Sequence, residues 1–158
     1  MVDVKLIPIE VLLGNPERMG VQISPDGKRV SYLAPLDGVM NVFAGDVGLG
    51  NERAVTHDTG RGIQNYLWAH DDRHLMYTRD KDGSEDFRLY DVDLETGVER
   101  DLTPLDGVQC RLMVHCKDFP NDVLIAMNKD NPQLHDVYHL DLTTGKLEKI
   151  VENPGFVG

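Results

Sequence analysis

The stretch "RLYDVDLETGVERDL", residues 88–102, decides the fold because two related stretches occur elsewhere in the chain. They are "NVFAGDVGLGNERAV", residues 41–55, and "DVYHLDLTTGKLEKI", residues 136–150. Aligned without gaps, the three share an aromatic residue, an aliphatic residue and a glycine at offsets of 47 and 48 residues. These shared positions are Phe43, Tyr90 and Tyr138, then Val47, Leu94 and Leu142, then Gly50, Gly97 and Gly145. Self-similarity at such a period indicates a repeat architecture.

A second recurring segment precedes each of these stretches. "ISPDGKRVSYL", residues 23–33, pairs a Pro-Asp-Gly turn with an alternating strand. In "WAHDDRHLMYTR", residues 68–79, Asp71-Asp72 stands in the place of Asp26-Gly27. Tyr77 stands 45 residues after Tyr32. A looser third copy is "FPNDVLIAMNK", residues 119–129, in which we place the turn at Pro120-Asn121. Each repeat therefore contains two pairs of strands.

The repeats resolve into four short strands each, rich in residues that suit a pleated surface. The predicted strands are 19–23, 28–34, 41–47 and 53–55, then 63–68, 74–78, 87–94 and 99–103, then 110–115, 122–127, 136–142 and 147–151. In the second repeat, Tyr90, Val92 and Leu94 share one face, while Arg88, Asp91 and Asp93 fall largely on or beside the other. Four antiparallel strands at this spacing are typical of β-propeller blades.

Glycine-containing turns separate the predicted strands, since tight hairpins need a positive φ. They are Asp37-Gly38, Asp82-Gly83, Thr96-Gly97 and Thr144-Gly145. Helical periodicity is confined to Ile9–Leu13. The predicted fold is all-β, a partial β-propeller of about three four-stranded antiparallel blades. Residues 1–18 form a leader with a short helix, and the blades span residues 19–58, 63–104 and 109–152.

Three blades do not close a ring, because propellers typically close with four to eight. An open arc leaves two blade faces uncovered, and monomers rarely tolerate large exposed apolar surfaces. We therefore expect this chain to belong to something larger, either as a piece of a protein with further blades or as a subunit that completes its ring with another copy.

Composition limits the classes of partner. The chain has 158 residues, is 41% hydrophobic and 27% charged, and carries a formal net charge of −11. Such a surface repels phosphate backbones and anionic lipid, so we expect neither nucleic-acid nor membrane binding. The first residues, "MVDVKLIPIEVLLGNPERMG", contain no signal-peptide apolar core, and we expect a cytoplasmic protein.

The two cysteines fit a reducing compartment. Cys110 and Cys116 both belong to the predicted strand "CRLMVHC", which separates their α-carbons by roughly 20 Å. This separation is too large for a disulfide. We predict buried or half-buried free thiols.

No serine has the context of a hydrolase nucleophile. Such a serine occupies a sharp strand-to-helix turn with the pattern G-x-S-x-G. Ser24 precedes a Pro-Asp-Gly turn, Ser31 lies within a strand, and Ser84 lies in an acidic turn. We predict no catalytic residue in this chain.

Two groups of potential metal ligands also lack the required geometry. His70 and His74 in "HDDRH" resemble the helical motif H-E-x-x-H, but they lie in a strand-connecting turn where the imidazoles diverge. Cys110, His115 and Cys116 have no recognised ligand spacing and are interpreted as strand side chains. We predict no metal site.

Two loops have compositions that suggest a ligand site but lack the required spacing. "DKDGSED", residues 80–86, would need ligands at Thr78 and Leu89 to match an EF-hand, so we interpret it as a solvated hairpin turn. "HDTGRG", residues 57–62, has no phosphate-cradle spacing and is interpreted as a linker between repeats. We predict no cofactor, and no motif identifies substrate-binding residues.

Taken together, "IPIEVLLGNPERMGVQISPDGKRVSYLAP" (residues 7–35) and "RGIQNYLWAHDDRHLMYTRDKDGSEDFRLYDVDLETGVERDLTP" (residues 61–104) reveal a family resemblance. They resemble the N-terminal propeller of prolyl oligopeptidase-like serine peptidases, in particular the acylaminoacyl-peptidase and dipeptidyl-aminopeptidase branch. The turn S-P-D-G alone is a WD40- or TolB-like repeat signal that Tol-system propellers share. The strings W-A-x-D and L-Y-x-V-D-x-x-T-G behind the "LLGNPER" leader make the resemblance more specific.

The resemblance implies a non-catalytic role. In that family the propeller caps a hydrolase domain, which carries the catalytic residues, and restricts entry to short peptides. The expected function is therefore the gating of peptide access to a hydrolase domain that is absent from these 158 residues. The alternative is a stand-alone binding or interaction propeller that completes its ring by oligomerisation. A third possibility, an enzyme with an undetected site in this chain, lacks a supporting motif.

Overall fold

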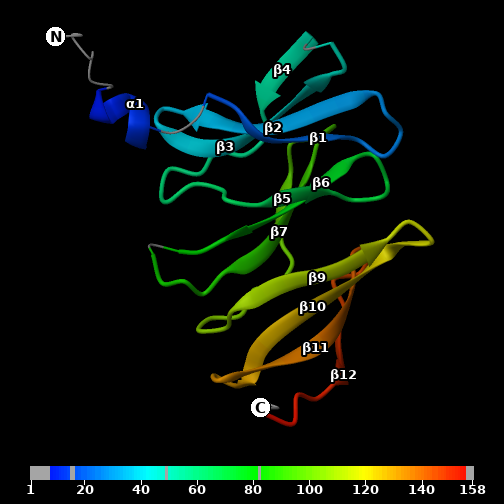
Figure 1. The fold of residues 1–158 in the computed structure, drawn as a ribbon. Coiled ribbons are helices and arrows are strands. Elements are labelled where there is room, and N and C mark those ends of the chain that lie inside the picture. Colours follow the sequence, from blue (N-terminus) through cyan, green and yellow to red (C-terminus); the bar gives the residue numbers. More distant parts are fainter. Residues whose placement is uncertain (1–7, 15–16, 49, 82, 156–158) are drawn as a thin grey trace, which may run out of the picture.

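The computed structural model describes residues 8–14, 17–48, 50–81 and 83–155. It contains one short helix, α1 (Ile9–Leu13), which matches the predicted helical segment. The remaining elements are strands that form three separate sheets, and Figure 1 shows these sheets stacked one after another along the chain. The helix has five residues, and the described residues contain no helix long and apolar enough to cross a membrane.

Each sheet has four strands, and neighbouring strands are antiparallel. The first blade contains β1 (Met19–Ile23), β2 (Arg29–Leu36), β3 (Val39–Asp46) and β4 (Gly50–Ala54). The second contains β5 (Tyr66–Trp68), β6 (His74–Arg79), β7 (Arg88–Asp93) and β8 (Glu99–Asp101). The third contains β9 (Cys110–Cys116), β10 (Phe119–Asn131), β11 (Leu134–Asp141) and β12 (Leu147–Val151). The predicted partial propeller of three antiparallel blades is confirmed.

The hydrophobic core lies between the blades, in two clusters. The first cluster joins blades one and two and contains Leu33, Val42, Tyr77 and Val92, among others. The second joins blades two and three and contains Met76, Leu89, Ile125 and Tyr138, among others. Because side chains alternate across a strand, the middle blade contributes Tyr77 to one cluster and Met76 to the other. Its two faces are therefore both covered.

Two covered faces also explain why acidic residues of β7 are buried. Asp91 and Asp93 alternate with Val92, and all three are buried. Arg100 donates from Nε to Asp91 Oδ1 over 3.0 Å, and from Nη2 to the carbonyl oxygen of Leu142 in the third blade over 3.1 Å. Burial of this carboxylate is tolerated because it is paired and hydrogen-bonded.

The turns agree with the sequence at most positions. Asp37 and Gly38 have φ values of 50° and 86°, and Gly97 and Gly145 have values of 73° and 72°, as hairpin turns require. Gly50, which aligns with Gly97, is instead the first residue of β4. The predicted turn at Asp82-Gly83 lies partly outside the described residues.

The turn predicted at Pro120-Asn121 is wrong. Both residues belong to β10, which begins at Phe119 and pairs with Cys116 across a turn at Lys117-Asp118. The register shifts between Phe119 and Val123, so an irregular strand end accommodates the proline. Such ends tolerate proline because its missing N–H interrupts no regular ladder bond.

The outer blades expose more large apolar side chains than the middle blade does. Among described residues, the large apolar side chains exposed on the second blade are limited to Val98. The first blade exposes Met19, Val21, Ile23 and Val47, and the third exposes Met113, Val114, Phe119, Ile150 and Val151. Val21 and Ile23 have exposed fractions of 62% and 63%. The outer blades therefore have uncovered apolar surface, as an open arc requires.

Candidate functional site

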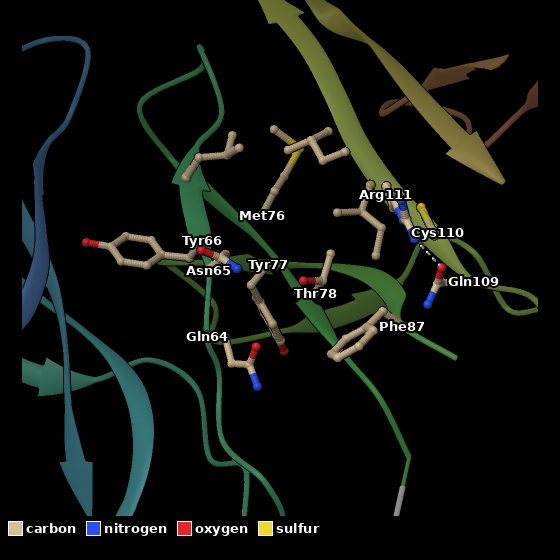
Figure 2. Close-up of a pocket in the computed structure, with 13 residues that line it drawn as sticks. Gln64, Asn65, Tyr66, Met76, Tyr77, Thr78, Phe87, Gln109, Cys110 and Arg111 are labelled. Atoms are coloured by element: carbon tan, nitrogen blue, oxygen red, sulfur yellow. Dashed lines mark hydrogen bonds between the residues drawn. The ribbon is translucent and has the colours of Figure 1, made fainter. Parts of the chain in front are cut away.

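A pocket with a volume of about 450 Å³ lies at the junction of the second and third blades. Its lining comes from β5, β6, β7 and the beginning of β9, together with the residues that lead into β5, β7 and β9. Figure 2 shows these side chains around the junction. The volume falls within the range of small-molecule sites.

The pocket has an apolar floor and a polar rim. Leu67, Met76, Phe87, Leu89 and Leu112 supply apolar surface. The polar side chains that line it are Gln64, Asn65, Thr78, Gln109 and Arg111. Few polar groups around an apolar cavity are the usual composition of a ligand site.

Two tyrosines line the pocket, but their hydroxyls are engaged elsewhere. Tyr66 donates to the carbonyl oxygen of Gly20 over 2.7 Å, and burial raises the pKa of Tyr66 to about 12. Tyr77 donates to the Glu99 carboxylate, and burial together with this negative charge raises the pKa of Tyr77. In Figure 2 the Tyr66 hydroxyl points towards the first blade. Neither group is available as an acid or base in the pocket.

Cys110 also lines the pocket, in a form that is chemically inert. Burial raises the pKa of the Cys110 thiol to about 12, so it remains protonated near neutral pH. A protonated, buried thiol is neither a nucleophile nor a strong metal ligand.

Gln109 organises the rim. Its Oε1 accepts from Arg111 Nη2 over 2.9 Å and lies 3.1 Å from His135 Nε2, and its Nε2 donates to the carbonyl oxygen of Glu85 over 3.0 Å. Burial, followed by the positive charge of Arg111, lowers the pKa of His135, so this imidazole is neutral near pH 7. The backbone N–H of Gln109 donates to Asn128 Oδ1 over 2.7 Å. Figure 2 marks the bond between Gln109 and Arg111.

Arg111, like Arg29 and Arg53, has no ion-pair partner among the described residues, but Arg29 and Arg53 donate to backbone carbonyl oxygens and do not line this pocket. The recorded hydrogen-bond acceptor of Arg111 is an amide oxygen, and within the described chain no carboxylate lies within ion-pair distance of it. By contrast, Arg88 and Arg100 each contact an aspartate. The pocket therefore combines apolar surface with an uncompensated positive charge, an arrangement suited to a ligand that is both apolar and anionic.

The serines considered in the sequence have structural contacts. Ser24 Oγ donates to Asp26 Oδ1 over 2.7 Å and accepts the Arg29 backbone N–H over 2.9 Å. Ser31 Oγ accepts the indole N–H of Trp68 over 2.8 Å. Ser84 Oγ accepts the backbone N–H of Asp86 over 3.2 Å.

The histidines of "HDDRH" contact different partners. His74 Nδ1 lies 2.5 Å from Asp71 Oδ2, whereas His70 stacks on His115 of the third blade with ring centroids 4.3 Å apart. In the described chain, no group of three or more His, Cys, Asp or Glu residues could hold a metal ion.

The structure adds detail on the two cysteines, on the acidic turn at residues 80–86 and on the linker at residues 57–62. Cys110 and Cys116 are both free, as predicted, but Cys116 is exposed rather than buried or half-buried, because it lies at the end of β9. Asp80 is not solvated: its side chain is 4% exposed and pairs with Arg61 over 3.3 Å. Within the 57–62 linker, Asp58 Oδ2 accepts the backbone N–H of Gly62 over 2.7 Å.

The pocket residues could not be identified from the sequence, because only the packing of the blades brings them together. Gln64, Thr78 and Arg111 lie on different strands or loops, and none belongs to a motif. One signal was present, since Arg111 interrupts the otherwise apolar start of "CRLMV".

Comparisons with known proteins agree with the repeat architecture. The chain is 43% identical over 150 residues to dipeptidyl aminopeptidase BIII of Pseudoxanthomonas mexicana, covering 94% of this chain and 22% of that protein. It is 33% identical over 160 residues to dipeptidyl peptidase family member 6 of Caenorhabditis elegans, covering 97% of this chain and 22% of the relative. The chain thus spans about a fifth of the length of either relative. No family model matches the chain.

Solved structures show the same fold at low identity. The β-propeller domain of the Trilobed protease from Pyrococcus furiosus has a TM-score of 0.63 at 18% identity. The match covers 86% of this chain and 43% of that structure's chain. TolB from Acinetobacter baumannii has a TM-score of 0.59 at 15% identity, covering 84% of this chain and 31% of its own.

The stacked four-stranded sheets and these neighbours define a partial β-propeller. The two sequence relatives indicate which class of propeller protein this chain resembles, since both are named as dipeptidyl peptidases. The resemblance to the N-terminal propeller region of prolyl oligopeptidase-family peptidases is therefore confirmed.

Proposed function

We propose that this chain is the propeller portion of a prolyl oligopeptidase-like serine peptidase and limits the access of peptides to a hydrolase domain. The observation that carries the proposal is the 43% identity to a dipeptidyl aminopeptidase, which extends over 94% of this chain. In this proposal the chain acts by steric exclusion and by charge, and bond cleavage occurs in the hydrolase domain.

The charge of the chain supports this role. The formal net charge is −11, and a peptide substrate of an aminopeptidase presents a positively charged amino terminus. An acidic propeller attracts such a terminus and repels polyanions. The contacts of Ser24 and Ser31 support cleavage elsewhere, because both hydroxyls bond within their own blade or to the adjacent blade.

Two measurements test the proposal. The coding sequence after the codon for Gly158 should continue into further blades and a G-x-S-x-G segment, and an immediate stop codon would contradict the proposal. If the longer protein exists, it should hydrolyse a short peptide nitroanilide and spare unfolded casein. Efficient hydrolysis of casein would exclude a gating propeller.

A second candidate is a stand-alone binding propeller that completes its ring with other copies of itself. The exposed apolar residues on the two outer blades favour this candidate, because a second copy could cover them. A defined oligomer of the 158-residue chain, together with a stop codon after Gly158, would support it over the peptidase proposal.

A further inference from the structure

We propose that the pocket between the second and third blades binds the carboxyl-terminal end of a short peptide whose last side chain is apolar. Arg111 pairs with the terminal carboxylate, and the apolar floor accepts the side chain. The choice of a peptide as ligand rests on the proposed function, whereas the anionic and apolar character of the ligand rests on the pocket itself.

The charge of the ligand follows from Arg111. Acidic residues outnumber basic ones by 27 to 16 in this chain, and most arginines pair with a carboxylate. Two other arginines without such a partner, Arg29 and Arg53, donate to backbone carbonyl oxygens. Arg111 contacts Gln109 instead, and it is exposed on β9 at the rim of the pocket. A guanidinium presents five donors in a planar fork, of which Gln109 accepts one, so donors remain for a carboxylate.

The rest of the ligand follows from the floor. Leu67 and Leu112 are half-buried at the pocket and pack against the core cluster that contains the buried Met76 and Leu89. A volume of about 450 Å³ accommodates a large side chain together with a few backbone atoms. Across the pocket, the exposed amides of Gln64 and Asn65 can donate to peptide carbonyl oxygens.

The rim geometry keeps Arg111 in position. The Gln109 oxygen that accepts from Arg111 also lies 3.1 Å from His135, whose imidazole is neutral near pH 7. In this form His135 donates its Nε2 proton to Gln109 and adds no charge to the site. Gln109 is itself fixed through the carbonyl oxygen of Glu85.

The test uses two probes with the purified 158-residue chain: acetyl-Ala-Phe with a free carboxylate, and the same dipeptide as a carboxamide. Calorimetry should show at least tenfold tighter binding of the free acid, as expected for a charge-assisted hydrogen bond. Arg111→Gln should remove this preference. Lys117→Gln removes an equal charge from an exposed turn and should leave it unchanged.

A second variant tests the location. Thr78→Phe fills the pocket from its half-buried wall and should abolish binding of both probes, with circular dichroism and thermal melting checking the fold. Equal affinity for the two probes, an unchanged preference in Arg111→Gln, or an absence of saturable binding would overturn the inference. If Arg111-dependent binding persists although no hydrolase sequence follows Gly158, the proposed function fails and the pocket assignment stands.

Discussion

The indole N–H of Trp68 donates a 2.8 Å hydrogen bond to the hydroxyl oxygen of Ser31, across the junction of the second and first blades. Both side chains are buried, with exposed fractions of 4% and 0%. Trp68 also belongs to the apolar cluster at this junction. A polar contact thus fixes the position of a large aromatic side chain within an otherwise apolar interface.

We expect Ser31→Ala to destabilise the chain by about 1–3 kcal/mol, because it leaves the buried indole N–H without an acceptor. Ser84→Ala is a matched control, since Ser84 is exposed, and it should change the free energy of unfolding by less than about 0.5 kcal/mol. Urea denaturation measures both values. Equal effects of the two substitutions would mean that the hydrogen bond from Trp68 to Ser31 does not contribute to the free energy of unfolding.

The ion pair between Asp91 and Arg100 should respond strongly to loss of the arginine. The Asp91 side chain is 2% exposed and the Arg100 side chain 42% exposed. Arg100→Ala leaves a buried carboxylate unpaired and also removes the bond to the Leu142 carbonyl. We expect a loss of about 2–3 kcal/mol, which is reduced from the buried-pair range by the exposure of Arg100.

Lys146→Ala is the control for this prediction, because Lys146 and Glu148 form an ion pair on the surface. The expected loss is below about 1 kcal/mol. Chemical denaturation at neutral pH gives both numbers. A loss for Arg100→Ala no larger than for Lys146→Ala would show that the buried carboxylate is solvated in solution.

The histidine stack should make stability depend on pH. Burial, followed by the charge of His70, lowers the pKa of His115 below its ordinary value of 6.5. Its unfolded form therefore binds a proton more readily, so stability is retained above about pH 6.5 and decreases as the pH falls below that value. In His115→Phe the aromatic stack is kept and this part of the decrease should disappear. Melting curves at several pH values check it, and an unchanged slope would contradict the assignment.

The two thiols should differ in reactivity. Cys116 is exposed, whereas Cys110 is buried and the pKa of its thiol is raised to about 12. We expect a thiol reagent to modify one cysteine in the native chain and both in denaturant. Mass spectrometry of the peptides identifies the modified residue. Rapid native modification of Cys110 would show that the second blade junction opens readily.

Much of the fold could be predicted because its signals are local. The shared aromatic, aliphatic and glycine positions and the alternating strands indicated blades before any packing was known. The turn at Pro120-Asn121 was misplaced because proline usually interrupts a strand, and the irregular register that admits it depends on β9. Burial of Asp91 could not be predicted, because alternation does not reveal that a neighbouring blade covers the polar face.

The pocket could not be predicted from the sequence for a related reason. Leu67 and Arg111 are far apart in sequence and meet only where two blades pack, so no spacing rule connects them. A single-chain pattern indicates which residues share a strand face, whereas a pocket depends on how two faces are placed. Even so, Arg111 interrupts the apolar residues at the start of β9, and this interruption is visible in the sequence.

The central claim is that these three blades form an open arc that needs neighbours to cover its outer faces. Sedimentation velocity of the purified chain over a wide concentration range tests it most directly. The account predicts concentration-dependent association, which Val21→Lys and Ile23→Lys should weaken by placing charge on the exposed face of β1. A monodisperse monomer at all concentrations that melts cooperatively would contradict it.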